Sequence, residues 1–185
     1  MMTALRAIGA EVPVPLAGSW ERAGHDGLAW SLTTHIPGGW TTNDRLARLI
    51  EPVAGFLRRL HSLPADGDPI AALVDRFGDG VWPVSTRDLE AHPALAGRPV
   101  LRARVARHAP AVRAALERGP FVLVHSDLHE ENVLSDGDRV GVIDFGETFT
   151  GVAGWEFASM AYFTSWDLAD AILIRYLDDP REAAT

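Results

Sequence analysis

The chain has 185 residues, of which 47% are hydrophobic and 23% are charged, a balance typical of a folded domain with a sizeable core. Its 17 Lys and Arg residues against 25 Asp and Glu residues give a formal net charge of −8, which offers no electrostatic footprint for a phosphate polymer, so we expect no nucleic-acid partner. The absence of cysteine excludes disulfides, Cys-ligated zinc and a thiol nucleophile.

The N-terminal segment has no apolar run long enough for a signal peptide, and no segment approaches the roughly 20 apolar residues of a membrane span. We therefore expect a cytoplasmic protein without a membrane partner. Residues 3–8 are typical of the end of a helix that Gly9 stops, and the prolines of VPVP (residues 12–15) favour an extended edge segment.

The next segments predict a strand followed by a buried helix. Residues 28–36 form an apolar and aromatic run that predicts a strand, and the turn residues Pro37-Gly38-Gly39 close it. Apolar residues then recur at helical spacing from residue 42 or 43 to residue 62, with Pro52 as the place for a kink.

The middle of the chain has a less regular pattern. Residues 64–99 are rich in Pro, Gly and Asp, and we expect an irregular excursion with short helices. Residues 101–118 predict a basic amphipathic helix that is interrupted near Pro110 and ended by Gly119-Pro120. Further along, the apolar pattern of residues 155–177 predicts two helices broken near Ser165.

Between these helical regions, the short apolar run at residues 121–124 predicts a buried strand that leads directly into the polar sequence HSDLH. Two further strands are predicted at residues 132–135 and 139–145, separated by the hairpin turn signal Asp136-Gly137-Asp138. A hairpin centred near residue 138 places Asn132 and Asp144 opposite one another at its open end.

These positions define a candidate catalytic centre. The Asn132 carbonyl oxygen and the Asp144 carboxylate are hard ligands that suit Mg²⁺, which usually takes few protein ligands. Asp127 lies on the loop that leaves the buried strand, within reach of the same place, where it can act as a base. The order HSDLHEEN at 125–132 and IDFG at 143–146 is the order used in protein-kinase-like phosphoryl transfer, and the joint spacing is more specific than either piece alone.

With HSDLHEENVL followed by GVIDFGE, the chain resembles the aminoglycoside phosphotransferase family of kinase-like enzymes. Other segments are also similar: LTTHIPGG at 32–39 resembles the family's hinge strand, and GFLRRLHSLP at 55–64 resembles the helix that follows it. The resemblance implies that Thr34 and Ile36 offer backbone groups to adenine, that Asp127 orients and deprotonates the acceptor hydroxyl, and that Asn132 and Asp144 hold Mg²⁺.

The resemblance also implies the architecture: an α+β chain, mainly helical, that corresponds to a protein-kinase-like C-terminal lobe with a short catalytic and metal-binding hairpin. Residues 1–40 then correspond to the end of the N-terminal lobe and the hinge strand, and residues 41–185 to the C-terminal lobe. The rest of the family's nucleotide lobe, with its phosphate-covering loop and its lysine, is not visible in this sequence.

The predicted function is transfer of the γ-phosphate of ATP or GTP to a hydroxyl group of a small molecule. One alternative is a kinase-like binding module that transfers little phosphate, because positioning and charge stabilisation provide most of the catalysis in this class. A metal-dependent phosphoesterase is less favoured, because no histidine follows His129 to complete its metal ligands. We expect His125 and His129 to order the loop rather than to act directly.

Overall fold

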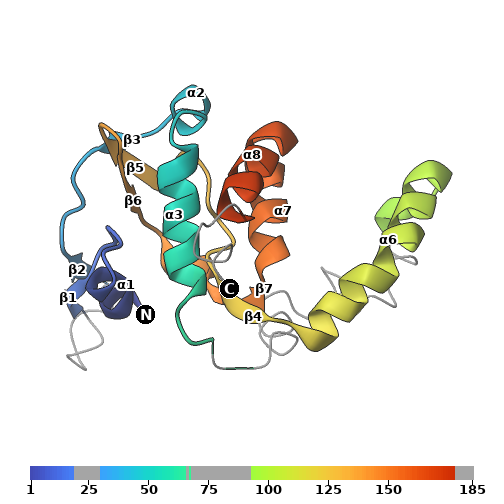
Figure 1. The fold of residues 1–185 in the computed structure, drawn as a ribbon, viewed down its shortest axis with the longest axis horizontal. Coiled ribbons are helices and arrows are strands. Elements are labelled where there is room, and N and C mark those ends of the chain that lie inside the picture. The colour runs from blue at the N-terminus through green and yellow to red at the C-terminus, as the bar shows by residue number, and fades with distance from the viewer. Residues whose placement is uncertain (19–29, 66, 68–92, 178–185) are drawn as a thin grey trace.

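The structure is a computed structural model that describes residues 1–18, 30–65, 67 and 93–177. It is an α+β arrangement (Figure 1). The helices are α1 (Met2–Ala7), α2 (Asn43–Leu46), α3 (Ile50–His61), α6 (Pro99–Arg118), α7 (Ala153–Phe163) and α8 (Trp166–Leu177), with 3-10 helices η2 (Pro93–Leu95) and η3 (Phe145–Glu147). The strands are β1 (Pro15–Gly18), β2 (Ser31–Thr33), β3 (Gly39–Trp40), β4 (Phe121–Val124), β5 (Val133–Asp136), β6 (Arg139–Val142) and β7 (Phe149–Val152).

The described strands form antiparallel ladders, β1 with β2, β3 with β5 and β6, and β4 with β7. The β5–β6 hairpin pairs Asp136 with Arg139 and so turns over two residues, of which Gly137 takes a positive φ of 61°. This turn is one residue tighter than the sequence suggested. As a result Ile143, and not Asp144, lies opposite Asn132, to whose carbonyl its backbone N–H donates at 3.1 Å.

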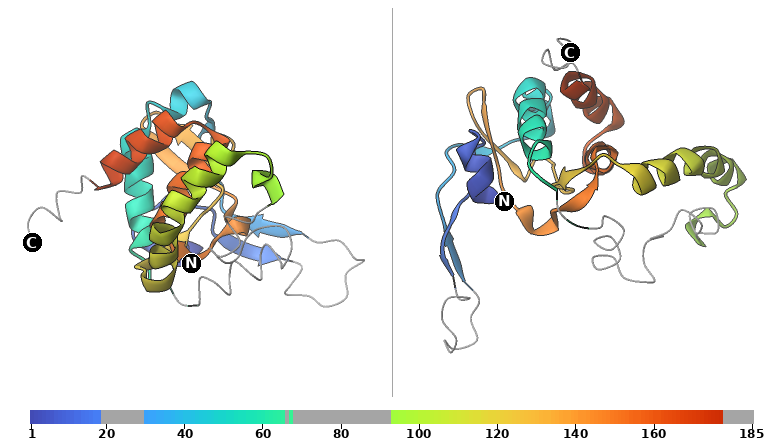
Figure 2. Two further views of the ribbon diagram at one scale, coloured as in Figure 1. Left: turned by 90° about the vertical axis from the view of Figure 1, so that its right-hand side faces the viewer. Right: turned by 60° about the horizontal axis from the view of Figure 1, so that its bottom comes forward.

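The core lies where α3, α7 and α8 pack together against the β5–β6 hairpin (Figures 1 and 2). The apolar face of α3 carries Phe56, Leu57 and Leu60, all essentially inaccessible to solvent. Burying each such side chain contributes roughly 1.5–3 kcal/mol. Leu128, in the predicted catalytic loop, belongs to the same core, so the loop is anchored to the helices through its apolar residue.

The segment predicted as one helix from residue 42 or 43 to 62 is two helices. Thr42 caps α2, because its hydroxyl accepts from the Arg45 N–H at 3.3 Å, and the helix ends after one turn. The second helix, α3, begins at Ile50. Pro52 therefore lies in the first turn of α3, where its missing N–H costs no helical hydrogen bond, and it produces no kink in the middle of a helix.

Helix α6 projects away from the body of the protein in Figures 1 and 2. It is continuous from Pro99 to Arg118 with Pro110 inside it, so the predicted interruption near Pro110 is wrong. Ala109 is the buried residue that the structure describes on this helix, and the helix can therefore accommodate a proline without disturbing a packed interface. None of the helices in the described ranges is long and apolar enough to cross a membrane.

Other predicted boundaries are confirmed. Helix α1 ends before Gly9, which has a φ of +82°, and the break between α7 and α8 falls at Ser165, whose hydroxyl accepts from the Leu168 N–H at 3.2 Å. The strand predicted at 28–36 is described only as the short β2, and most of the excursion predicted at 64–99 lies outside the described residues.

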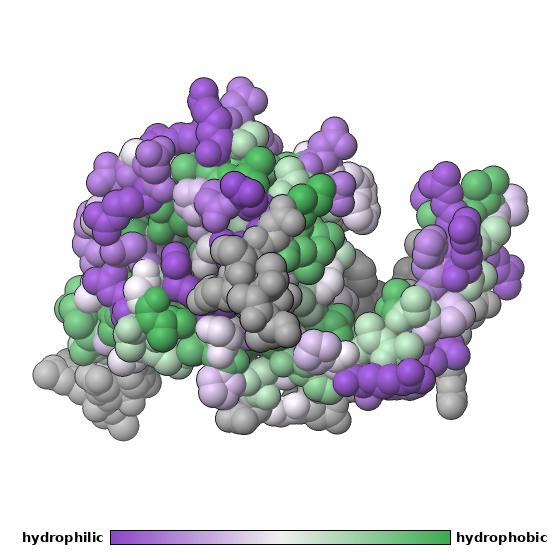
Figure 3. Space-filling model, in the orientation of Figure 1, coloured by the Kyte–Doolittle hydropathy of each residue, from purple (hydrophilic) through white to green (hydrophobic). Residues whose placement is uncertain are grey.

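In Figure 3, hydrophobic side chains reach the surface over α7 and α8.

Candidate active site

The loop that follows β4 is held by a buried histidine. The Nδ1 atom of His125 accepts from the Asp127 N–H at 3.3 Å, and its Nε2 lies 2.9 Å from the Ile143 carbonyl. Because a backbone N–H can only donate, Nδ1 carries no proton and Nε2 is the donor to Ile143. Burial lowers the pKa of His125, which keeps the ring neutral in this arrangement. These contacts support the loop-ordering role expected for His125.

Asp127 and Asn132, predicted as base and metal ligand, are in direct contact. The Asn132 amide nitrogen lies 2.8 Å from the backbone carbonyl of Asp127 and 2.9 Å from its Oδ2 atom. Both amide hydrogens can therefore be donated to Asp127, which leaves the Asn132 side-chain oxygen for another partner. Asn132 is buried, whereas the Asp127 side chain keeps 23% of its exposure, so an anchored carboxylate faces solvent.

His129 lies against the other oxygen of the same carboxylate. Its Nε2 atom is 3.5 Å from Asp127 Oδ1, and its Nδ1 atom accepts from the Glu131 N–H at 3.3 Å. The same Nε2 atom lies 3.2 Å from the Asn132 amide nitrogen. The His129 ring therefore borders both Asp127 and Asn132.

Asp144 lies at the end of the β5–β6 hairpin, directly after Ile143. It adopts a left-handed backbone conformation with a φ of 57°, is exposed, and accepts from the Gly146 N–H at 3.3 Å. A non-glycine residue in this conformation is strained and is often found at functional sites. The structure thus brings Asp127 and Asn132 together and places Asp144 next to the residue that pairs with Asn132.

The donor set at this hairpin fits a magnesium ion. The Asn132 side-chain oxygen and the Asp144 carboxylate are hard oxygen ligands, as Mg²⁺ prefers. In the part of the chain that the structure describes, no group of three or more His, Asp or Glu side chains could hold a metal. A metal here would therefore have few protein ligands, and the additional donors that a two-metal phosphoesterase needs are not found among those residues.

Thr34 and Ile36, predicted to contact adenine through their backbone, follow β2. The Thr34 N–H donates to the Val14 carbonyl at 2.9 Å and its hydroxyl accepts from the Val14 N–H at 2.9 Å. Of the Thr34 backbone, the carbonyl is therefore the group that remains for a ligand. The Ile36 side chain is buried against Gly141 of β6, where an added Cβ would lie 2.2 Å from its Cγ2 atom.

A buried glutamate of α7, which the sequence analysis did not identify, also holds the loop that carries Asp127. Glu156 Oε2 accepts from the N–H groups of His125 at 2.7 Å and Ser126 at 3.4 Å. One helical turn further, the Ser159 hydroxyl donates to the Ser126 carbonyl, while the Ser126 hydroxyl donates to the Glu147 carbonyl at 3.0 Å. Ser126 has a φ of 65°, and these contacts maintain its strained backbone.

A negative charge on Glu156 is destabilising, because the side chain is buried. The residue has no solvent exposure, and burial raises the pKa of its carboxyl to about 7. Its Oε1 atom is buried without a hydrogen-bond partner among the described residues. The only sequence signal was an acidic residue within the apolar segment WEFASM, and such a residue is rarely buried unless it has a specific partner.

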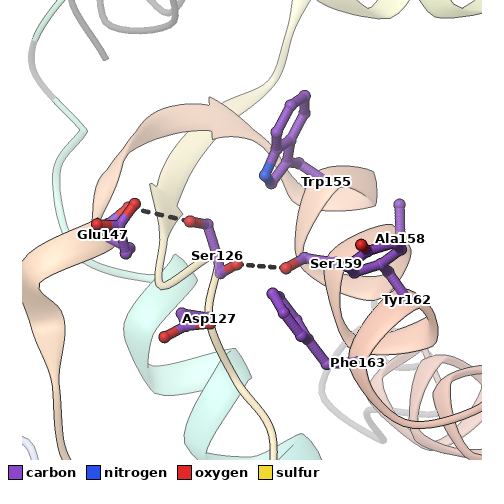
Figure 4. A pocket seen from close by; sticks show the side chains of 8 residues that line it. All are labelled: Ser126, Asp127, Glu147, Trp155, Ala158, Ser159, Tyr162 and Phe163. Atoms are coloured by element: carbon purple, nitrogen blue, oxygen red, sulfur yellow. Dashed lines mark hydrogen bonds between the residues drawn. The ribbon is translucent and has the colours of Figure 1, made fainter. Parts of the chain in front are cut away.

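A cavity of about 540 Å³ opens beside Asp127 (Figure 4). Its described lining comes from the catalytic loop, from Glu147 and from one face of α7, and consists of Ser126, Asp127, Glu147, Trp155, Ala158, Ser159, Tyr162 and Phe163. The positions on α7 follow the i, i+3, i+4, i+7, i+8 spacing of a single helix face. That spacing was present in the sequence, but the tryptophans alone did not indicate a binding site.

A model of the phosphotransferase enzyme family matches residues 1–184 of the chain. No curated protein matches it at a significant level. Among solved structures, ADP-bound aminoglycoside phosphotransferase APH(2'')-Ib is similar with a TM-score of 0.56 and 18% identity, over 95% of this chain and 63% of that chain.

Two further solved structures resemble the chain. Aminoglycoside phosphotransferase APH(3'')-Id from Streptomyces rimosus has a TM-score of 0.59 and 22% identity, over 95% of this chain and 71% of that chain. A choline/ethanolamine kinase family protein from Mesorhizobium loti has a TM-score of 0.59 and 16% identity, over 95% of this chain and 58% of that chain. These proteins are protein-kinase-like, and at such identities the likeness concerns the fold. The chain spans less than two thirds of the length of two of these three structures.

Proposed function

The chain belongs to the phosphotransferase enzyme family, and from that premise we propose that it transfers the γ-phosphate of ATP or GTP to a hydroxyl group of a small molecule. The observation that carries the proposal is the contact between Asn132 and Asp127 at the end of the hairpin that bears Asp144. The nucleotide and aminoglycoside complexes among its structural neighbours support a nucleotide donor and a small acceptor.

In this proposal Asp127 is the general base. Its carboxylate is partly exposed and fixed on one oxygen by the Asn132 amide, so it can orient an acceptor hydroxyl and take its proton. Asn132 and Asp144 would hold Mg²⁺, which supplies charge neutralisation for the phosphates. Thr34 and Ile36 would bind the adenine or guanine base through their backbone.

The same proposal assigns the regions of the fold. Residues 1–40 would correspond to the end of the nucleotide lobe and the hinge strand of a kinase, and residues 41–185 to the C-terminal lobe. The donor would then lie over the β5–β6 hairpin, on the Asp144 side of Asp127, and the acceptor would occupy the cavity that Asp127 and α7 line.

One observation favours the second candidate, a kinase-like binding module that transfers little phosphate. The sequence contains no lysine, so the lysine that kinase-like enzymes direct to the donor phosphates does not come from this chain. Arginine can neutralise phosphate, but it has a different shape and a different hydrogen-bonding geometry. Weak transfer with measurable nucleotide binding is the outcome that this candidate predicts.

The decisive experiment compares the protein with its Asp127→Asn variant for Mg²⁺-dependent binding of ATP and GTP and for phosphate transfer to a panel of small alcohols. We expect transfer to fall about 10²- to 10⁴-fold while nucleotide binding is retained, because the Asn side chain cannot take the proton but its oxygen can still accept from the Asn132 amide. Asp138→Asn, in the exposed hairpin turn, is the matched control and should behave as the unmodified protein. Unchanged transfer in Asp127→Asn would refute the role of Asp127, and binding without transfer in the unmodified protein would favour the binding module.

A further inference from the structure

The cavity beside Asp127 has an aromatic wall on an exposed helix face. Trp155, Tyr162 and Phe163 all belong to the cavity-lining face of α7 (Figure 4). Tyr162 keeps 81% of its exposure and Phe163 keeps 45%, although the opposite face of α7 is buried in the core. Large apolar side chains gathered on a solvent-facing surface next to a carboxylate favour a binding role.

These rings are ordered by contacts with one another and with the catalytic loop. Phe163 lies 5.2 Å from the His129 ring and 5.1 Å from the Tyr162 ring, measured between centroids, and Trp155 packs edge-on against Phe149 at 5.6 Å. His129 in turn faces the Asp127 carboxylate. The aromatic wall is therefore fixed relative to the group that would receive the acceptor proton, and a bound molecule would pay little to order it.

The charges of the cavity restrict what can bind there. Among its described lining residues, the charged side chains are Asp127 and Glu147, both acidic. An anionic acceptor would be repelled by the Asp127 carboxylate, which keeps 23% of its exposure. An acceptor with many amino groups would lose hydration against the rings, and the Asp127 carboxylate cannot compensate several positive charges.

On the premise of the proposed function, we propose that this cavity binds an alcohol or phenol acceptor with a planar, apolar body and at most one positive charge. Tyr162 and Phe163 are its specificity-determining residues. The rings of the acceptor and of α7 stack, and the acceptor hydroxyl reaches the Asp127 carboxylate. A single ammonium group is accommodated by the Asp127 carboxylate and by the aromatic faces.

The test measures binding without nucleotide, so that it does not depend on phosphate transfer. The probes are 2-naphthalenemethanol, which is planar and neutral, and kanamycin, which carries several amino groups, each titrated by calorimetry and by ligand-observed NMR. We expect 2-naphthalenemethanol to bind more tightly than kanamycin. Tyr162→Ser and Phe163→Ser should each weaken its binding about 3- to 10-fold, as expected for loss of one aromatic contact.

Trp40→Ser is the matched control, because Trp40 is 74% exposed and belongs to β3 rather than to the cavity. Circular dichroism should show the same fold for all three variants, since the substituted side chains are exposed. Preference for kanamycin, absence of binding by 2-naphthalenemethanol, or equal weakening in Trp40→Ser would overturn the proposal. A change in oligomeric state confined to the Tyr162 and Phe163 variants, with no effect on either probe, would also overturn it.

Phosphate transfer is then measured separately with ATP and Mg²⁺, by mass spectrometry of both probes. Binding of 2-naphthalenemethanol that depends on Tyr162, without transfer, supports the specificity of the cavity and counts against the phosphotransferase function. Transfer to kanamycin that is insensitive to Tyr162→Ser supports the function and refutes the acceptor class. The two proposals can therefore fail independently.

Discussion

The two faces of α7 differ in burial and in the kind of side chain that they carry. The inner face carries Glu156, which has no solvent exposure and accepts hydrogen bonds from the N–H groups of His125 and Ser126. The outer face carries the exposed rings of Tyr162 and Phe163. One face holds the loop that carries Asp127, and the other presents aromatic rings to solvent.

The two faces contribute differently to the stability of the protein. A buried carboxylate whose Oε1 atom has no partner among the described residues is destabilising, and the hydrogen bonds that its Oε2 atom accepts from the loop with Asp127 offset part of this cost. The exposed rings contribute little to the core. We therefore expect substitutions of these rings to leave the protein folded and the loop with Asp127 unchanged.

Replacing Glu156, which holds the loop from the buried face of α7, should have the largest effect on stability. In Glu156→Ala the buried N–H groups of His125 and Ser126 lose their acceptor, and we expect a loss of about 4 kcal/mol in the free energy of unfolding at pH 5. Urea denaturation followed by circular dichroism measures it. Glu131→Ala, in an exposed residue of the same loop, is the control and should change stability by less than about 0.5 kcal/mol. Similar values for both variants would remove Glu156 from its anchoring role.

The charge of Glu156 can be separated from its hydrogen bonds by pH. Burial raises the pKa of its carboxyl from 4.5 to about 7, so the folded state binds a proton that the unfolded state has released. The stability contributed by this group is fully present below pH 4.5 and is lost as the pH rises through about 7, in total on the order of 3 kcal/mol.

Glu156→Gln keeps an acceptor for both N–H groups and has no charge to bury. Between pH 5 and pH 8 the free energy of unfolding of the unmodified protein should decrease by about 3 kcal/mol more than that of this variant. At pH 8 the variant should be the more stable of the two. Denaturation midpoints of the two proteins across this range test the expectation. Parallel curves would mean that the Glu156 carboxyl is not the group that titrates.

The local features of this fold were predictable from sequence. Gly9 ends a helix because it adopts a positive φ, and Ser165 begins one because its hydroxyl accepts from the Leu168 N–H. Gly137 adopts the positive φ of the hairpin turn. The proximity of Asp127 and Asn132 was also predictable, since both lie in one short loop, and they meet in the structure.

Features set by long-range packing were not predictable in this way. The division of the 42–62 helix was missed, and so was the continuity of α6, which accommodates Pro110 because it has little packed interface to disturb. The hairpin register was misjudged by one residue because the turn signal Asp136-Gly137-Asp138 does not specify a turn of two residues. Glu156 contacts His125, which is distant from it in the sequence, and no local sequence pattern predicts such a contact. The aromatic face of α7 became recognisable as a binding surface only when the loop with Asp127 was placed beside it.

Ser159 lies at the border between the two faces of α7, and its substitution gives the smallest of these effects. Its hydroxyl donates to the buried Ser126 carbonyl, so Ser159→Ala should cost about 1 kcal/mol of stability and should speed amide exchange at Asp127 more than it speeds exchange in the core of α3. Ser62→Ala removes a hydroxyl that donates to the Arg59 carbonyl at 2.8 Å at an exposed helix end, and it should leave exchange at Asp127 unchanged. If both variants leave that exchange unchanged, Glu156 alone holds the loop, and the anchoring face of α7 is narrower than its contacts suggest.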